Sequence, residues 1–356
     1  MQLPSALRQG IERELISCDR AALRAAAARL SECYRGSLPS HAPAITAQAP
    51  VAPGAPGPTA FRPTALSTDL KRAAYLAVRL PATFAAAAAA LAWSVECCNL
   101  EPHTVLDLGS GPGSALWAAA QLFPTLEAAT AFERDPRLIE IARRLAAHAP
   151  HIALRQAAWL QGDLTANIPE GAWELVVCSY ALNELPAAQR SEFIRKAWAR
   201  TANLLVVIEP GTKAGFANIL AVRTRLLAEG ATLVAPCPNA LACPMAAGDD
   251  WCHFAARVER TAEHRRLKDA TLGHEDEKFC YVAFSRTALS RSVLPHNEAP
   301  DEVPIAGARI VRHPRIFSGY TQLTLCRQGE LAAITVTRSM KEDWRRLKRL
   351  GRGDRW

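Results

Sequence analysis

Apolar and polar positions change their period repeatedly along this chain, and the changes predict alternating strands and helices. Short apolar runs at 105–108, 128–132, 174–178 and 204–208 have the length and composition of buried strands. The segments between them repeat their apolar positions at helical intervals. Because strand and helix alternate over 104–230, the pattern predicts an α/β domain built on a doubly wound, mostly parallel sheet.

The flanking patterns predict smaller units around this domain. Residues 3–35 and 67–100 have helical periodicity, and the second region is broken at Pro81. A further strand is expected near 152–159, and the segment EKFCYVAF around Cys280 is expected to be the sixth strand of the sheet. Short alternating runs predict a small C-terminal β module with strands at 309–311, 320–326 and 331–336.

Proline-rich stretches mark the expected boundaries between these units. Between 36 and 63, Pro alternates with Ala, Gly and Thr, a composition typical of a linker. The expected units are a helical module at 1–35, a Pro/Ala-rich linker at 36–66, the α/β domain at 67–286 with a helical cap at 67–100 and a cysteine-rich segment at 236–280, a linker at 287–303, the β module at 304–340 and a basic tail at 341–356.

The amino-acid composition indicates the cellular compartment and the kind of binding partner. The formal charge of +8 favours an anionic partner. The apolar stretch 80–95 is too short and too rich in alanine to span a bilayer, so we expect a buried helix and no membrane association. Acidic residues near the N-terminus, Glu12 and Glu14, argue against a secretory or transit segment. Ten cysteines in 356 residues suit a reducing compartment, and we expect a cytoplasmic protein.

The segment TVLDLGSGPG at 104–113 is the strongest chemical signal in the chain. A buried strand with one acid, Asp107, leads into Gly109-Ser110-Gly111-Pro112-Gly113, and a helix follows. Glycine lets the backbone approach a ligand closely, and a helix start presents free N–H groups. The spacing G-x-G-x-G resembles the turn of class I S-adenosylmethionine (SAM) methyltransferases rather than the G-x-G-x-x-G of dinucleotide folds. The alternative is an ordinary tight turn between strand and helix.

Two further acids follow predicted strands at positions suited to a nucleoside. Glu133 ends the second strand, twenty positions beyond Gly113, where a carboxylate can accept both hydroxyls of a ribose. Asp163 follows the next strand and is a candidate for the adenine amine. The simpler interpretations are a surface glutamate paired with Arg134 and a turn aspartate.

The fourth predicted strand opens into SYALNELP, at the edge of the sheet where ligands bind in open α/β folds. Ser179, Tyr180 and Asn183 are therefore the candidates for contacts near a reacting methyl group. The segment contains no N-P-P-Y or D-P-P-Y signature of amine methylation. The pattern consequently does not identify a catalytic base.

Four cysteines form a second candidate site after the fifth strand. Cys237, Cys243, Cys252 and Cys280 are separated by 5, 8 and 27 residues, without a C-x-x-C pair. Thiolate ligands suit zinc or an iron–sulfur cluster, and the spacing does not distinguish the two. The alternative is a set of unrelated buried cysteines.

Taken together, VLDLGSGPG, SYALNELP, VIEPGT, DDWCHF and EKFCYVAF resemble the methyltransferase-like small-ribosomal-subunit family. Its members are mitochondrial ribosomal small-subunit assembly factors and their bacterial homologues. The resemblance runs from LSECYR to GDRW, outside the proline-rich linker. It implies a class I methyltransferase fold, association with the small ribosomal subunit or its rRNA, and a [4Fe–4S] cluster. The cluster ligands it implies are Cys237, Cys243, Cys252 and Cys280, and the SAM contacts are Asp107, Gly109, Gly111, Gly113 and Glu133.

The basic tail is consistent with an RNA partner. Residues 341–356 carry seven basic and three acidic side chains, a net charge of +4, with Trp344 and Trp356 among them. We therefore expect a SAM-dependent methyltransferase of rRNA that is monomeric away from the ribosome. The alternatives are a non-catalytic assembly factor that binds SAM and the cluster, and a small-molecule methyltransferase with a zinc site.

Overall fold

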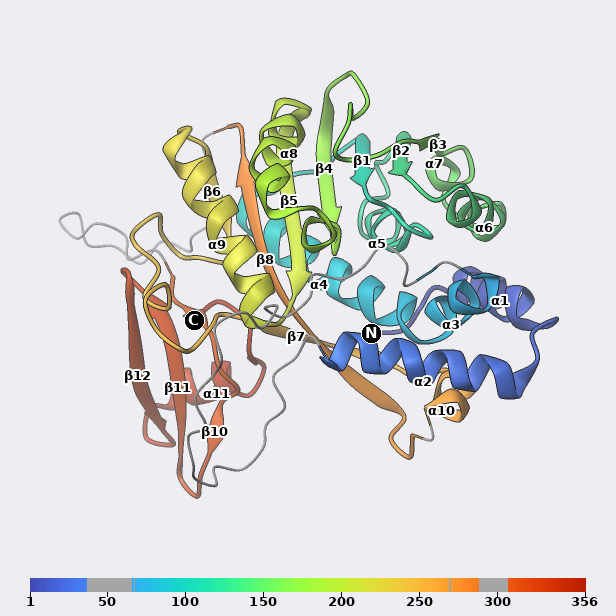
Figure 1. Ribbon diagram of the computed structural model, residues 1–356. Helices are drawn as coiled ribbons and strands as arrows, with labels where there is room; N and C mark the ends of the chain where they lie inside the picture. Colours follow the sequence, from blue (N-terminus) through green and yellow to red (C-terminus); the bar gives the residue numbers. More distant parts are fainter. Residues whose placement is uncertain (37–65, 67, 269, 288–306) are drawn as a thin grey trace, which may run out of the picture.

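A computed structural model describes residues 1–36, 66, 68–268, 270–287 and 307–356 of the chain (Figure 1). Its centre is a mostly parallel sheet with the strand order β3-β2-β1-β4-β5-β8-β6, and β7 pairs with β8 beside it. Its strands are β1 (Thr104–Leu108), β2 (Ala128–Glu133), β3 (Ala158–Gln161), β4 (Trp173–Ser179), β5 (Thr201–Pro210), β6 (Thr232–Ala235), β7 (Phe254–Glu259) and β8 (His274–Ser285).

Helices cover both faces of this sheet (Figure 1). Side chains of α4 and α5 pack on one face, in a core with Phe84, Leu116 and Val105, while α8 and α9 cover the other with Phe193 and Ile219. The helices are α1 (Ser5–Leu15), α2 (Arg20–Gly36), α3 (Asp69–Val78), α4 (Leu80–Cys98), α5 (Ser114–Leu122), α6 (Pro136–Ala146), α7 (Ile152–Arg155), η2 (Leu182–Glu184), α8 (Ala187–Ala199), α9 (Lys213–Ala228), α10 (Ala262–Leu267) and α11 (Lys341–Leu347).

Strand directions explain why the central strands are so apolar. β1 pairs in parallel with β2 and β4, and β4 pairs in parallel with β5. Helices on both faces exclude water from such strands, so no polar alternation is needed. In β1, only Asp107 interrupts the buried apolar side chains. The doubly wound sheet expected from the sequence is confirmed.

β8 is the exception to the parallel arrangement. The strand EKFCYVAF is present as expected, but it lies antiparallel between β5 and β6. In this register Cys280 is opposite Glu209, and Phe279 is opposite Pro210. The N-terminal half of β8 continues beyond the sheet and pairs with β7. β8 therefore pairs with β5 and β6 in the sheet and, through its N-terminal half, with β7.

The helix α4 is the only one in the described part of the chain that is long and apolar enough to cross a membrane. Two thirds of its most apolar window, 67%, is buried inside the fold. Its alanines let it pack closely on α5 and β8, and Phe84 and Leu91 are fully buried there. The buried helix expected at 80–95 is therefore present in the core.

The N-terminal helices pack against the central domain. α1 contacts α6, where Arg144 donates two hydrogen bonds to the Glu14 carboxylate at 2.7 Å. α2 packs against α3 and α10 through Leu23 and Leu30.

The expected strand near 152–159 is partly wrong. His151 caps a short helix, α7, by accepting a hydrogen bond from the Ala153 N–H, and the strand β3 begins only at Ala158.

A second, antiparallel sheet lies at the C-terminal end (Figure 1). Its small core contains Ile310, Leu323, Leu325, Val336 and Leu347. The expected linkers at 36–66 and 287–303 lie almost entirely outside the described residues. The strands of this sheet are β9 (Arg309–Ile310), β10 (Arg315–Ile316), β11 (Tyr320–Arg327) and β12 (Glu330–Thr337).

Candidate functional site

A cleft of about 690 Å³ lies at the carboxyl ends of β1, β2 and β4. This edge is where open α/β sheets bind their ligands, because the strand order reverses between β1 and β4. Every candidate cofactor residue except Gly113 lines the cleft, and so do all three candidates for the methyl-transfer region. The structure thus gathers side chains that the sequence places up to 76 residues apart.

The glycine turn after β1 forms the floor of this cleft. The N–H groups of Gly109 and Ser110 donate to the Phe132 carbonyl at 2.8 and 3.2 Å, which fixes the turn on β2. Gly109 has a φ of 75°, and a Cβ there would lie 2.6 Å from the Ala181 Cβ. Gly111 has a φ of 53°, but a Cβ there would meet no atom within 4 Å. Its backbone therefore faces open space in the cleft.

Glu133 points toward this turn. One carboxylate oxygen, Oε2, accepts the Gly111 N–H at 2.9 Å, and the other, Oε1, accepts the Asp135 N–H at 2.9 Å. A carboxylate oxygen has a second lone pair, so each can still accept a hydroxyl. These two backbone hydrogen bonds fix the orientation of the Glu133 carboxylate beside the glycine turn.

Asp107 is a buried acid with unused hydrogen-bonding capacity. Its side chain is 1% exposed, and neither carboxylate oxygen has a hydrogen-bond partner among the described residues. Burial, with a smaller contribution from the Glu133 charge, raises the pKa of Asp107 to about 8. A cationic group in the cleft would stabilise the ionised form of Asp107.

Among the described residues, the hydroxyl and amide oxygens of three more cleft residues are buried without a hydrogen-bond partner. They are the hydroxyl oxygens of Ser110 and Ser179 and the Oδ1 of Asn183. Buried polar atoms are nearly always hydrogen-bonded in folded proteins, so a group of exceptions in one cleft needs a cause. A polar ligand that completes these bonds is the simplest one.

Tyr180 connects the cleft to β8 and to the helices above it. It has a φ of 59°, an uncommon conformation for a non-glycine residue. Its hydroxyl donates to Glu277 at 3.0 Å, and Arg79 donates two hydrogen bonds to the same carboxylate at 2.9 and 3.0 Å. Tyr75 also lines the cleft, and burial raises its pKa to about 12. Tyr75 of α3, together with Arg79 and Thr83 at the start of α4, therefore lines one side of the cleft.

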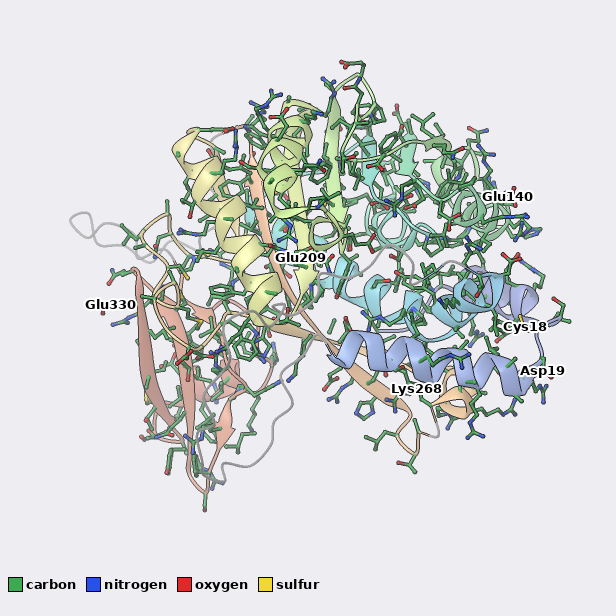
Figure 2. All side chains as sticks on the ribbon, in the orientation of Figure 1. Cys18, Asp19, Glu140, Glu209, Lys268 and Glu330 are labelled. Atoms are coloured by element: carbon green, nitrogen blue, oxygen red, sulfur yellow. The ribbon has the colours of Figure 1, made fainter. Side chains whose placement is uncertain are left out.

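A fully buried carboxylate, Glu209, supports the rim from β5 (Figure 2). It accepts a hydrogen bond from the Asn218 amide at 2.8 Å and one from the Asn183 N–H at 3.3 Å, and burial raises its pKa to about 7.

Asp163, the candidate for the adenine amine, is bonded within its own turn. Its Oδ1 accepts hydrogen bonds from both the N–H and the hydroxyl of Thr165. This bonding occupies one Asp163 oxygen within its own turn.

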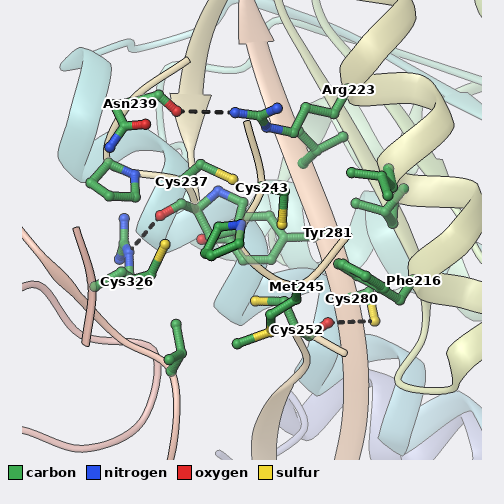
Figure 3. A pocket seen from close by; sticks show the side chains of 18 of the residues that line it. Phe216, Arg223, Cys237, Asn239, Cys243, Met245, Cys252, Cys280, Tyr281 and Cys326 are labelled. Atoms are coloured by element: carbon green, nitrogen blue, oxygen red, sulfur yellow. Dashed lines mark hydrogen bonds between the residues drawn. The ribbon is translucent and has the colours of Figure 1, made fainter. Parts of the chain in front are cut away.

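The cysteines line a second cavity, between α9, β8 and the C-terminal sheet (Figure 3). All four candidate ligands, Cys237, Cys243, Cys252 and Cys280, line it. Cys326 of β11 lines it too, which the spacing analysis did not include. The cavity is thus formed by the α/β domain and the C-terminal sheet together.

No three His, Cys, Asp or Glu side chains in the described ranges are grouped closely enough to hold a metal ion. Burial raises the pKa of the Cys252 and Cys280 thiols well above the usual value. The Cys280 thiol donates to the Cys252 carbonyl at 3.1 Å.

Arginines surround these thiols. Arg309 is 4% exposed and donates to the Pro236 and Gly353 carbonyls at 2.9 and 2.7 Å, while Arg223 donates to the Asn239 and Leu241 carbonyls. Arg352 lies close enough to Cys252 and Cys280 for a favourable charge interaction. Such positive charge favours an anionic occupant of the cavity.

Sequence reasoning missed several residues of both sites. Glu277 and Arg79 lie 198 positions apart, and nothing in their local sequence indicates that they pair. Cys326 and Arg309 reach the cysteine cavity only because the C-terminal sheet folds back on it. The sequence offered one signal for Cys326 and Arg309: a cysteine and an arginine lie in strands of the predicted β module.

Comparison with known families gives a match over most of the chain. A family model described as mitochondrial small ribosomal subunit Rsm22 matches residues 69–356. The human ribosome assembly protein METTL17, mitochondrial, is 29% identical over 191 residues, which cover 48% of this chain and 40% of that protein. The Rsm22-cox11 tandem protein 2, mitochondrial, of Schizosaccharomyces pombe is 32% identical over 158 residues, which cover 40% of this chain and 21% of that protein.

The matched region is thus less than half the length of these curated relatives. A solved structure of magnesium protoporphyrin IX methyltransferase from Synechocystis PCC 6803 with bound SAM is 15% identical, with a TM-score of 0.38 over 58% of this chain and 80% of that chain. The class I methyltransferase fold expected from the sequence is confirmed by the strand order itself. The expected cytoplasmic location is wrong, because the family model and both relatives are described as mitochondrial.

Proposed function

The chain belongs to the mitochondrial small ribosomal subunit Rsm22 family, and from this premise we propose a SAM-binding protein that acts on the small ribosomal subunit and its rRNA. The observation that carries the SAM proposal is the set of buried polar atoms without described partners in one cleft. Asp107, Ser110, Ser179 and Asn183 supply them, beside a glycine turn whose Gly111 N–H donates to Glu133.

The residues present fit SAM chemically. Glu133 would accept the ribose hydroxyls, and the turn from Gly109 to Gly113 would adjoin the methionine part, where Asp107 is an anionic partner for an ammonium group. When bound, SAM supplies an electrophilic methyl group on a sulfonium. The chain would orient the nucleophile at Ser179 and Asn183, and α3 and α4 would exclude water from the cleft.

One observation favours a non-catalytic role as the second candidate. The Tyr180 hydroxyl donates to the Glu277 carboxylate, which Arg79 also binds, so this hydroxyl is held away from a role as a base. A protein of this kind would use SAM to order the cleft while it assists subunit assembly. The small-molecule methyltransferase with a zinc site is the weaker alternative.

We also propose that Cys237, Cys243, Cys252 and Cys280 hold a [4Fe–4S] cluster. Their common cavity and the arginines around it support this proposal, since a cluster bound by four thiolates is anionic. When bound, the cluster would supply a cross-link between the cysteine segment and β8. Anaerobic purification with iron, sulfide and zinc analysis tests it: equal iron and sulfide support the cluster, whereas stoichiometric zinc supports the alternative.

Calorimetry with SAM tests the first proposal. The wild type is expected to bind, Glu133→Ala to bind at least about tenfold more weakly, and Glu140→Ala, an exposed glutamate on α6, to match the wild type. Failure of the wild type to bind SAM would reject every cofactor-dependent version.

Mapping of rRNA methylation in a deletion strain separates the two candidates. An enzyme predicts a methyl mark that disappears and returns with the wild type but not with Glu133→Ala. A scaffold predicts unchanged marks and a defect in small-subunit assembly that the wild type corrects.

A further inference from the structure

The excess positive charge of the chain is concentrated in its C-terminal unit. Residues 307–356 contain twelve Lys and Arg and four Asp and Glu, an excess of eight that equals the formal net charge of the whole chain. The preceding 306 residues are therefore neutral in sum. An anionic partner would be attracted to this unit rather than to the cleft side of the protein.

Within this unit, one end of the sheet carries exposed aromatic and cationic side chains together. The turn between β10 and β11 places Phe317 against Tyr320, with ring centroids 4.8 Å apart and planes within 12°. The Arg315 guanidinium lies 5.6 Å from the Phe317 ring centroid. Ile316 is 80% exposed and Phe317 is 37% exposed. This group, which we call the aromatic tip, comprises Arg315, Ile316, Phe317 and Tyr320.

The aromatic tip is not needed to build the module. The core of the C-terminal sheet is formed by Ile310, Leu323, Leu325, Val336 and Leu347, together with partly buried side chains of α11 and the tail, and it includes neither ring of the tip. Exposed apolar side chains that do not pack in a core indicate a contact surface.

The hairpin that carries the tip has cations and no acid, while α11, which packs on the neighbouring β12, begins with Glu342 and Asp343. β12 ends beside the tip, where Tyr320 pairs with Thr337, and Arg338 follows with its guanidinium 5.9 Å from the Trp344 ring. Glu330 is the only acid in 307–341, and it lies at the opposite end of the sheet, in the turn between β11 and β12 (Figure 2). The tip therefore combines flat rings with cations and has no acid in its own hairpin.

We propose that the aromatic tip binds an unpaired RNA base, with Arg315 and Arg338 neutralising the adjoining phosphates. Stacking on aromatic rings and on guanidinium planes is how proteins bind bases that are free of a duplex. Aromatic and arginine side chains are also common in protein interfaces, so a protein partner is one of the outcomes of the test below. This inference depends on the proposed rRNA partner and adds the residues that contact it.

Fluorescence anisotropy with the full chain and a labelled single-stranded RNA tests the tip directly. Phe317→Ala/Tyr320→Ala is expected to lower the affinity about tenfold, as loss of one stacked base does. Leu331→Ala, which removes an exposed apolar side chain at the other end of the sheet, is expected to bind as the wild type does. Arg315→Ala/Arg338→Ala is expected to reduce the salt dependence of binding.

The outcomes separate the two levels of the proposal. If the wild type binds RNA and the double aromatic variant binds within twofold of it, the tip is not the site, although the RNA partner stands. If the wild type binds no RNA, the rRNA part of the proposed function fails together with the tip. If the aromatic variant loses the small subunit but not free RNA, the tip binds protein and the inference is overturned. Should that variant misfold, Phe317→Leu/Tyr320→Leu keeps apolar bulk and is expected to show the same loss.

Discussion

The cofactor cleft and the cysteine cavity are built in opposite ways from the same sheet. The cleft is lined by acids, among them Asp107, Glu133 and Glu184, whereas arginines lie around the thiols of the cavity. The candidate cofactor residues of the cleft lie at the ends of strands or in the turns that follow them, while the cavity needs side chains from β8, the segment after β6, and the C-terminal sheet. The first environment suits a sulfonium cation and the second an anionic cluster, so the two sites are expected to respond to different variants.

The largest expected effect is at the cavity. Cys252→Ser removes one of four proposed ligands, and iron and sulfide per chain are expected to fall to background in anaerobic preparations. Cys18→Ser, a half-buried cysteine on the N-terminal side of α2, serves as the control and should keep full iron. Full iron in Cys252→Ser would show that Cys252 is not a ligand. The proposed cluster site in the cavity would then be rejected.

The second effect is at the cleft. Glu133→Gln is expected to weaken SAM binding about tenfold to hundredfold in calorimetry, because charge-assisted hydrogen bonds contribute about 1.5–3 kcal/mol each. Its iron content should equal that of the wild type. A loss of iron in this variant would show that the two sites are one cooperative unit and would break the comparison.

The third effect is a pH dependence that belongs to Asp107. Its raised pKa of about 8 means that the folded chain holds a proton that the unfolded chain loses near pH 4. The contribution of Asp107 to the free energy of unfolding therefore falls as pH rises from about 4 to about 8. SAM affinity should rise over pH 6–8 as the carboxylate forms, and Asp107→Asn should flatten both profiles. A wild-type affinity that is constant over this range would contradict the assigned role of Asp107.

The smallest effect is expected at Asp163. One of its oxygens already accepts two hydrogen bonds from Thr165, and the side chain lies near the surface. Asp163→Ala is expected to change SAM affinity less than about threefold, within the range of a weak surface contact. A loss as large as that of Glu133→Gln would instead place the adenine amine on Asp163.

The sequence predicts a site better when the residues of that site lie close together in the chain. Asp107, Gly109, Gly111 and Glu133 could be identified because a strand, its turn and the next strand are adjacent in the chain, and parallel pairing brings their ends together. The alternation of strand and helix predicted the doubly wound, mostly parallel sheet for the same reason, although it did not give the strand order. β3 begins later than expected because a capped turn of helix precedes it, and β6 and β7 were not predicted.

The cavity could be predicted only in part. The four cysteines were identified as a set from their residue type and from family resemblance, but their surroundings depend on long-range packing. Arg309 reaches the Pro236 carbonyl across 73 positions, and Cys326 enters the cavity from a separate sheet. No local period or spacing encodes such contacts, because they arise only when two separately folded units pack against each other.

The concentration of charge in the last fifty residues also makes the protein an electric dipole. In the field of a polyanion such a molecule experiences a torque, which favours an approach with the C-terminal sheet nearest the polyanion. Added salt would then slow productive encounters more than it hastens departure, because orientation is set before contact.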